Sequence, residues 1–87
     1  MIHSGKDLAF MNQGKHLVVS DSGTSSLVVF DFSKFLSSKE LPVVTRRNYK
    51  DPGFEVLEGI GEIESTIDGE KLLISSIMCP LVMLSLE

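Results

Sequence analysis

The chain has 87 residues, of which 43% are hydrophobic and 23% are charged, and its formal net charge is −4. This composition is typical of a globular protein and argues against disorder, while the length permits one small domain with a modest core. The single cysteine, Cys79, excludes an intrachain disulfide, and His3 and His16 lack the spacing of a metal site. We therefore expect no metal and no cofactor, and we expect that another chain adds stability.

The charge is unevenly distributed. Residues 1–50 carry seven Lys or Arg and four Asp or Glu, a net charge of +3, whereas residues 51–87 carry one Lys and eight acids, a net charge of −7. The basic half is too weakly charged to indicate a nucleic-acid partner. A plain solvated surface is the favoured interpretation, and attraction between the complementary halves, within the chain or between copies, is the alternative.

The chain shows no targeting pattern. Residues 1–6 lack the basic and apolar regions of a signal peptide. The longest uncharged stretch, residues 72–86, has fifteen residues with Pro80 inside it, which is too short for a spanning helix. We expect a cytoplasmic protein that binds no membrane.

Short apolar runs rich in β-branched residues follow one another along the chain, separated by Gly, Pro, Asn, Asp and Ser, and this pattern predicts strands. Strands are expected at Leu8–Met11, His16–Ser20, Ser26–Phe32 and Pro42–Thr45, and then at Gly61–Ile67, Lys71–Ile77 and Leu81–Leu86. The segment Phe54–Leu57 either extends the first group of strands or begins the second.

The connections support hairpins. The turns at Asn12–Lys15 and at Asp68–Glu70 place glycine beside Asn, Gln or Asp, a strong hairpin signal. Ser33 is expected to cap one short helical turn through Leu36, and the polar stretch 46–53 is expected to form a loop. The predicted fold class is all-β with antiparallel sheets.

An internal repeat is the most informative feature of the sequence. Gly14 and the run 17–20 (LVVS) recur as Gly69 and the run 72–75 (LLIS), at an offset of 55. Residues 27–32 (LVVFDF) correspond to residues 81–86 (LVMLSL) at an offset of 54, because one residue is lost in the loop. Self-similarity at a fixed period can define a fold. We expect a single domain, 1–87, with two hairpin repeats over about 6–50 and 54–87.

Residues 12–31 (NQGKHLVVSDSGTSSLVVFD) resemble the blade repeat of YVTN-type and lactonase-type β-propellers, in which an Asp-Gly-Lys-like turn, an apolar strand, a small-polar loop and a strand ending in Asp follow one another. Residues 68–75 (DGEKLLIS) resemble the first part of that repeat. The resemblance implies antiparallel four-stranded sheets that form two propeller blades. The second repeat departs at Ser85, where the closing Asp would stand, and lacks a fourth strand, which Met1–Ser4 or another molecule would have to supply.

No motif predicts catalysis, so we expect no catalytic residue. His16 is expected in solvent and Cys79 in an apolar environment as an inert thiol. The acids Glu55, Glu58, Glu62 and Glu64 leave a calcium site as an alternative, although Glu62 and Glu64 on one strand face are more simply solvated. The basic cluster 46–50 (RRNYK) is expected to be a solvated loop.

The C-terminal apolar run predicts an interface, because a blade cannot cover both of its faces alone. The expected interface residues are Ile74, Ile77, Met78, Leu81 and Met83. The expected function is a non-catalytic binding or scaffold module, a homo-oligomer or part of a larger propeller. The alternatives are a lectin-like sugar-binding trimer, disfavoured because the chain has no tryptophan, and a fragment of a propeller enzyme such as a lactonase or dehydrogenase. A small barrel or α+β domain is the alternative if the repeat is accidental.

Overall fold

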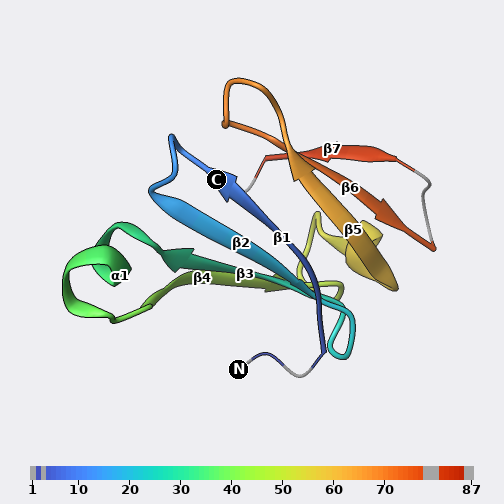
Figure 1. Cartoon of the computed structure of the whole chain (residues 1–87). Coiled ribbons are helices and arrows are strands. Elements are labelled where there is room, and N and C mark those ends of the chain that lie inside the picture. The colour runs from blue at the N-terminus through green and yellow to red at the C-terminus, as the bar shows by residue number, and fades with distance from the viewer. Residues whose placement is uncertain (1, 3, 78–80, 86–87) are drawn as a thin grey trace.

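The computed structural model describes residues 2, 4–77 and 81–85, which form two antiparallel sheets (Figure 1). The first sheet has the strand order β1 (Gly5–Met11), β2 (His16–Asp21), β3 (Ser26–Asp31) and β4 (Val43–Asn48). The second sheet has the order β5 (Ile60–Ser65), β6 (Leu72–Ser76) and β7 (Val82–Leu84). The α-helix α1 (Ser33–Ser38) joins β3 to β4, and the 3₁₀ helix η1 (Glu55–Leu57) lies between the sheets in sequence. The prediction of antiparallel, nearly all-β sheets is confirmed.

The first hairpin is closed by the predicted turn. Asn12, Gln13 and Gly14 all have positive φ, at 51°, 57° and 83°. Right-handed strand twist favours such backbone conformations in tight hairpins, and glycine adopts them without steric cost. Gly69 has φ of 73° in the corresponding turn of the second sheet.

Two segments differ from the prediction. β4 continues through Arg46 and Arg47 to Asn48, because the free edge of β3 pairs with that stretch. The guanidinium of Arg47 also lies over the ring of Phe54, with its central carbon 5.6 Å from the ring centroid. The segment 54–57 forms η1 instead of a strand, and its Leu57 is fully buried.

Helix α1 is longer than expected and is not capped by Ser33. Its N-cap position is Phe32, and the Ser33 hydroxyl donates instead to the Asp31 carboxylate at 2.6 Å. The helix ends where Lys39 adopts a left-handed conformation with φ of 63°, and the Lys39 N–H donates to the Phe35 carbonyl. This C-terminal geometry satisfies a carbonyl that would otherwise lack a partner.

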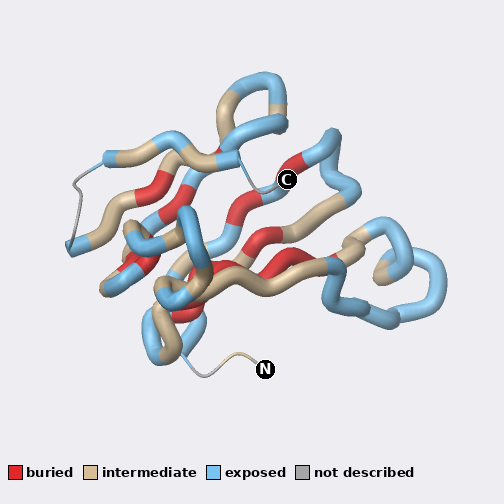
Figure 2. Tube along the Cα trace, turned by 180° about the vertical axis from the view of Figure 1, so that it is seen from behind, coloured by how far each residue is buried: buried red, intermediate tan, exposed pale blue. Residues whose placement is uncertain are grey.

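The core lies between the two sheets, which meet along β1 and β5 (Figure 2). Alternate residues of each strand point to opposite faces of a sheet, so each sheet contributes one set of side chains to this core. The buried members of the core are Ala9, Met11, Val18, Leu27, Val29, Leu57, Ile60, Ile63, Leu72 and Ile74.

The second sheet has three strands among the described residues. Of the segment Met1–Ser4, which was considered as a fourth strand, the structure describes Ser4 beside the first sheet: its N–H donates to Asp21 Oδ1 at 2.9 Å and its carbonyl accepts the Ser22 N–H at 3.0 Å. Ser4 is therefore held at the end of β2 and not beside β7.

Ile74 is 1% exposed and packs between the sheets, so we expect Ile74→Ala to lower the free energy of unfolding by about 2–5 kcal/mol through lost burial and a cavity. Ile67→Ala is the matched control, because Ile67 is fully exposed in a turn and its truncation should change stability by less than about 0.5 kcal/mol. Urea unfolding of dilute protein measures both. Equal effects of the two substitutions would contradict the assignment of Ile74 to the core.

Candidate functional site

The first sheet has an apolar face turned away from the second sheet, and we call it the outer face of the first sheet. Because residues 9, 11, 18, 27 and 29 point into the core, the residues between them point outward. On β1, β2 and β3 this face consists of Leu8, Phe10, Leu17, Val19, Val28 and Phe30, all hydrophobic, which the strand register places side by side. On β4 it continues with Val43, which pairs with Phe30, and with Arg46, which pairs with Val28 and is its one charged member among these strand pairs.

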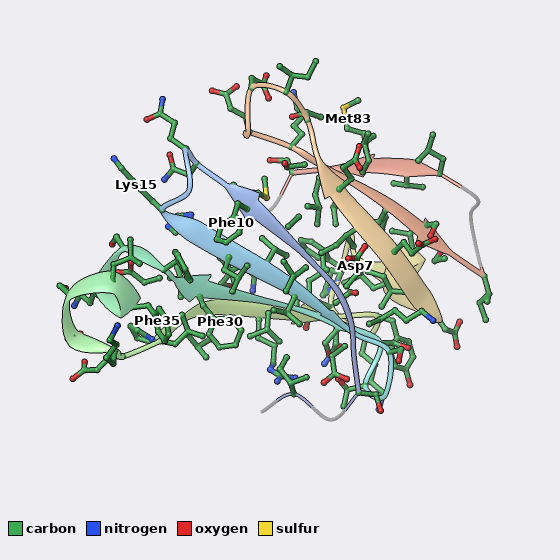
Figure 3. All side chains as sticks on the ribbon, viewed as in Figure 1. Asp7, Phe10, Lys15, Phe30, Phe35 and Met83 are labelled. Carbon is green, nitrogen blue, oxygen red and sulfur yellow. The ribbon has the colours of Figure 1, made fainter. Side chains whose placement is uncertain are left out.

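This face is only partly covered by the chain itself. Val28 and Phe30 are buried at its centre, but Leu8 is 56% and Phe10 is 45% exposed. Rings from the connection to β4 extend the face at one end: Phe32 packs edge-on to Phe10 with centroids 5.0 Å apart and stacks on Phe35 at 5.5 Å. Figure 3 labels Phe10, Phe30 and Phe35, which lie toward the end of the first sheet at which α1 is attached.

The second sheet has an outer face of different chemistry. Ile63, Ile74 and Val82 are directly paired across the sheet on the side of the core, so the neighbouring paired row, Glu64–Leu73–Met83, faces outward. With Glu62 and Ser75 these residues make up the outer face of the second sheet. It combines two carboxylates with two apolar side chains, of which Met83 is 58% exposed and is labelled in Figure 3.

Polar contacts lock the two sheets in register along β1 and β5. The Asp7 carboxylate accepts the Ile63 N–H at 2.9 Å, and the Ser20 hydroxyl donates to the Gly61 carbonyl at 2.9 Å. Asp7 points from β1 toward the second sheet in Figure 3. Bonds of this kind satisfy backbone groups that the irregular pairing of β5 leaves without a ladder partner, and so they fix how one sheet sits on the other.

The two turns at the other end of these strands are also joined. The Asn12 N–H donates to the Gly69 carbonyl at 2.9 Å. The sheets are thus tied at both ends of the line along which they meet, and the apolar core lies between these ties.

A cleft of about 780 Å³ opens between β4 and the turn that joins β5 to β6. Arg47 and Lys71 bring positive charge to its lining, and Asp68 and Glu70 bring negative charge. Hydrogen bonds from the Thr66 hydroxyl and the Glu70 N–H lower the pKa of Asp68, so this carboxylate stays ionised. The Arg47 Nε is buried without a hydrogen-bond partner. The cleft therefore offers both charges to a polar ligand, without a single dominant chemistry.

The predicted interface residues are not all at the surface. Ile77, Leu81 and Met83 are 80%, 66% and 58% exposed, whereas Ile74 lies in the core. Met78 is outside the described residues, as are Cys79 and His3.

The residues weighed as ligands do not gather. Among the described residues, no group of three or more His, Cys, Asp or Glu side chains is placed to hold a metal ion, which includes the acids at 55, 58, 62 and 64. His16 is partly exposed and contributes to the lining of the cleft. In the part of the chain that the structure describes, no helix has the length and apolar character needed to cross a bilayer.

The outer face of the first sheet was not predicted from the sequence. Its signal was present in the pair Leu8 and Phe10, which flank the core residue Ala9 on β1 and make that strand apolar on both sides. A strand that is apolar on both sides is typical of a sheet covered on both faces.

Comparison with known proteins identifies the arrangement of the sheets. No protein-family model matches the sequence, and no curated protein matches it. A solved structure of a luciferin-regenerating enzyme, a β-propeller, matches 97% of this chain with a TM-score of 0.53 and 20% sequence identity. The two sheets are arranged as neighbouring blades of a β-propeller. The chain corresponds to 29% of the length of that structure, and at this sequence identity the similarity supports the fold and no function.

The Asp7 contact between the blades gives a prediction with an internal control. Asp7→Ala removes the acceptor of the Ile63 N–H and should lower the free energy of unfolding by about 1–3 kcal/mol. Glu62→Ala changes the residue that stands 55 positions later, on the exposed outer face of the second sheet, and should have little effect in dilute solution. Chemical denaturation of both variants tests this. A loss of stability in Glu62→Ala equal to that in Asp7→Ala would contradict it.

Proposed function

We propose that this protein is a non-catalytic binding or scaffold module whose two propeller blades bind other protein chains through their uncovered faces. The observation that carries the proposal is the outer face of the first sheet, where six hydrophobic side chains lie side by side and Leu8 and Phe10 stay about half exposed. Contiguous apolar surface of this kind is characteristic of interaction sites in folded proteins.

The covered face of the second sheet shows how completely such apolar residues are buried when another sheet packs on them. On the second sheet the face that meets the first sheet carries Ile63, Leu72 and Ile74, which are 6%, 0% and 1% exposed. Burial of apolar side chains stabilises by about 25 cal/mol per Å² of surface removed from water. The outer face of the first sheet has the same kind of residues, and no sheet formed by the described residues covers it, which supports binding of a partner there.

The blade type that we propose is the YVTN-like or lactonase-like one. Its support is the sequence of residues 12–31, in which the turn, the apolar strand, the small-polar loop and the strand ending in Asp31 follow the order of that repeat. The structure forms a hairpin turn at Asn12–Gly14 and strands β2 and β3 in the corresponding segments.

Phe10→Glu tests the binding face. A carboxylate at the centre of an apolar contact must be desolvated on binding, so we expect a loss of about 2 kcal/mol of association free energy, which is a roughly 30-fold weaker association. Sedimentation velocity over a range of concentrations measures it on the intact chain.

Val44→Glu is the matched control. Val44 is 53% exposed on the same sheet but lines the cleft instead of the outer face, so its substitution should leave association unchanged. The proposed function would be refuted if the wild-type chain stays monomeric at high concentration and binds no separately added propeller-blade protein. Equal weakening of association by Val44→Glu and Phe10→Glu would also refute it.

A further inference from the structure

The repeat relates the faces of the two sheets in a specific way. At the offset of 55, Val18 and Ser20 on the packed face of the first sheet correspond to Leu73 and Ser75 on the outer face of the second. Conversely, Leu17 and Val19 on the outer face of the first sheet correspond to Leu72 and Ile74 on the packed face of the second. The two uncovered faces are therefore counterparts of the two faces that already meet inside the chain.

Hydrogen bonds show that the correspondence is structural as well as sequential. The Ser20 hydroxyl lies 3.4 Å from the carbonyl of Asp7, and the Ser75 hydroxyl lies 3.4 Å from the carbonyl of Glu62, each across to the neighbouring strand. Asp7 and Glu62 are also separated by 55 positions, and the strand pairing shifts register beside both of them. The outer face of the second sheet is thus built like the packed face of the first.

We propose that the outer face of the second sheet binds the outer face of the first sheet of a second copy of this chain, head to tail, in the register that joins the two sheets within one copy. This inference rests on the proposed function and names its partner. Such an interface is heterologous, since two different faces meet, and repeated rotation closes it into a ring or extends it into a longer array.

The intrachain contacts identify the polar bonds of the new interface. The bond from the Ile63 N–H to Asp7 Oδ2 becomes one from the Leu8 N–H of the second copy to the Glu62 carboxylate. Within one copy this exposed Leu8 N–H donates to Asp7 Oδ1 at 2.8 Å, so Glu62 replaces Asp7 as its acceptor when the two copies meet. The bond from the Ser20 hydroxyl to Gly61 becomes one from the Ser75 hydroxyl to the carbonyl of Lys6 of the second copy. Within the described chain Ser20 donates across to the other sheet at 2.9 Å, while Ser75 has the 3.4 Å bond to its own sheet and no counterpart of that cross-sheet bond.

Charge also favours this pairing. The outer face of the second sheet carries Glu62 and Glu64 and belongs to the half of the chain with a net charge of −7. The outer face of the first sheet carries Arg46, which pairs with Val28, and belongs to the half with a net charge of +3. Opposite charges on the two faces accelerate encounter and disfavour contact between two identical faces. We therefore expect association to weaken as salt is raised.

The correspondence departs at Glu64, which stands where the first sheet has the buried Ala9. Desolvation of this carboxylate opposes association. We accordingly expect a reversible, concentration-dependent assembly instead of a permanent one.

Mixing two variants tests the head-to-tail arrangement. Phe10→Glu blocks the outer face of the first sheet, and Met83→Glu blocks that of the second, since Met83 corresponds to the core residue Val29. At a protein concentration near the dissociation constant of wild type, a roughly 30-fold weaker association leaves each variant alone essentially monomeric, as judged by sedimentation. Their equimolar mixture should form a one-to-one dimer through the single pair of intact faces. Circular dichroism and urea unfolding establish that both variants are folded.

The outcomes separate this inference from the proposed function. If wild type associates, Phe10→Glu abolishes association and Met83→Glu does not, the first sheet pairs with itself or with another surface, and only the head-to-tail inference fails. If the mixture of variants forms no dimer although wild type associates, the inference also fails. If wild type neither associates nor binds an added blade, both proposals fail.

Substitutions at Glu62 test the register. Glu62→Ala should weaken association about tenfold without loss of stability in the monomer, because it removes the acceptor for the Leu8 N–H of the second copy. Glu62→Asp should retain association, because Asp7 makes the corresponding bond within the chain. Equal weakening by both substitutions, or weakening by neither, would contradict the register.

Discussion

The structure depends on one constraint: an antiparallel sheet whose strands are apolar on both sides needs cover on both faces. In this chain the first sheet has that composition, and the second sheet covers one of its two faces. The core between the sheets, with Val18, Leu27, Leu72 and Ile74 essentially inaccessible, is the result. What remains uncovered on the first sheet is a direct consequence of the same alternation, because a strand cannot place Ala9 in the core without placing Leu8 and Phe10 on the opposite side.

Hydrophobic burial does not by itself fix how two sheets align, since it has no direction. The alignment here comes from a few directional contacts at the line where β1 and β5 meet: Asp7 with the Ile63 N–H, Ser20 with the Gly61 carbonyl, and Asn12 with the Gly69 carbonyl. These bonds join polar groups of one repeat to the backbone of the other. Repetition of the sequence places corresponding groups on the uncovered faces. The contacts between the two blades of one chain therefore predict how a blade of a second copy would bind.

The candidate binding surfaces follow from this geometry more than from any single reactive residue. The cleft beside β4 brings together charges of both signs, and the acids of the second sheet are spread over an exposed face. The uncovered sheet faces, in contrast, have defined shape, composition and register. They are the surfaces for which we propose a class of partner, another β-blade.

The sequence by itself determined most of the strands and the hairpin turns, because these depend on local properties: β-branched runs, and glycine beside Gln13 or Asp68 in the turns. It also determined the repeat, through the spacing of 55 residues, and indicated two propeller blades. The pairing of Arg46–Asn48 with β3 and the helix at Glu55–Leu57 depend on tertiary contacts and were not predicted. Only the tertiary structure decided which apolar residues are core and which are surface. Ile74 was expected at an interface with another chain and lies between the sheets. Phe10 was not predicted as an interface residue, and its side chain is about half exposed. The physical reason is that alternation divides a strand into two faces but does not say which face meets the other sheet, and that choice is made by contacts between residues more than forty positions apart.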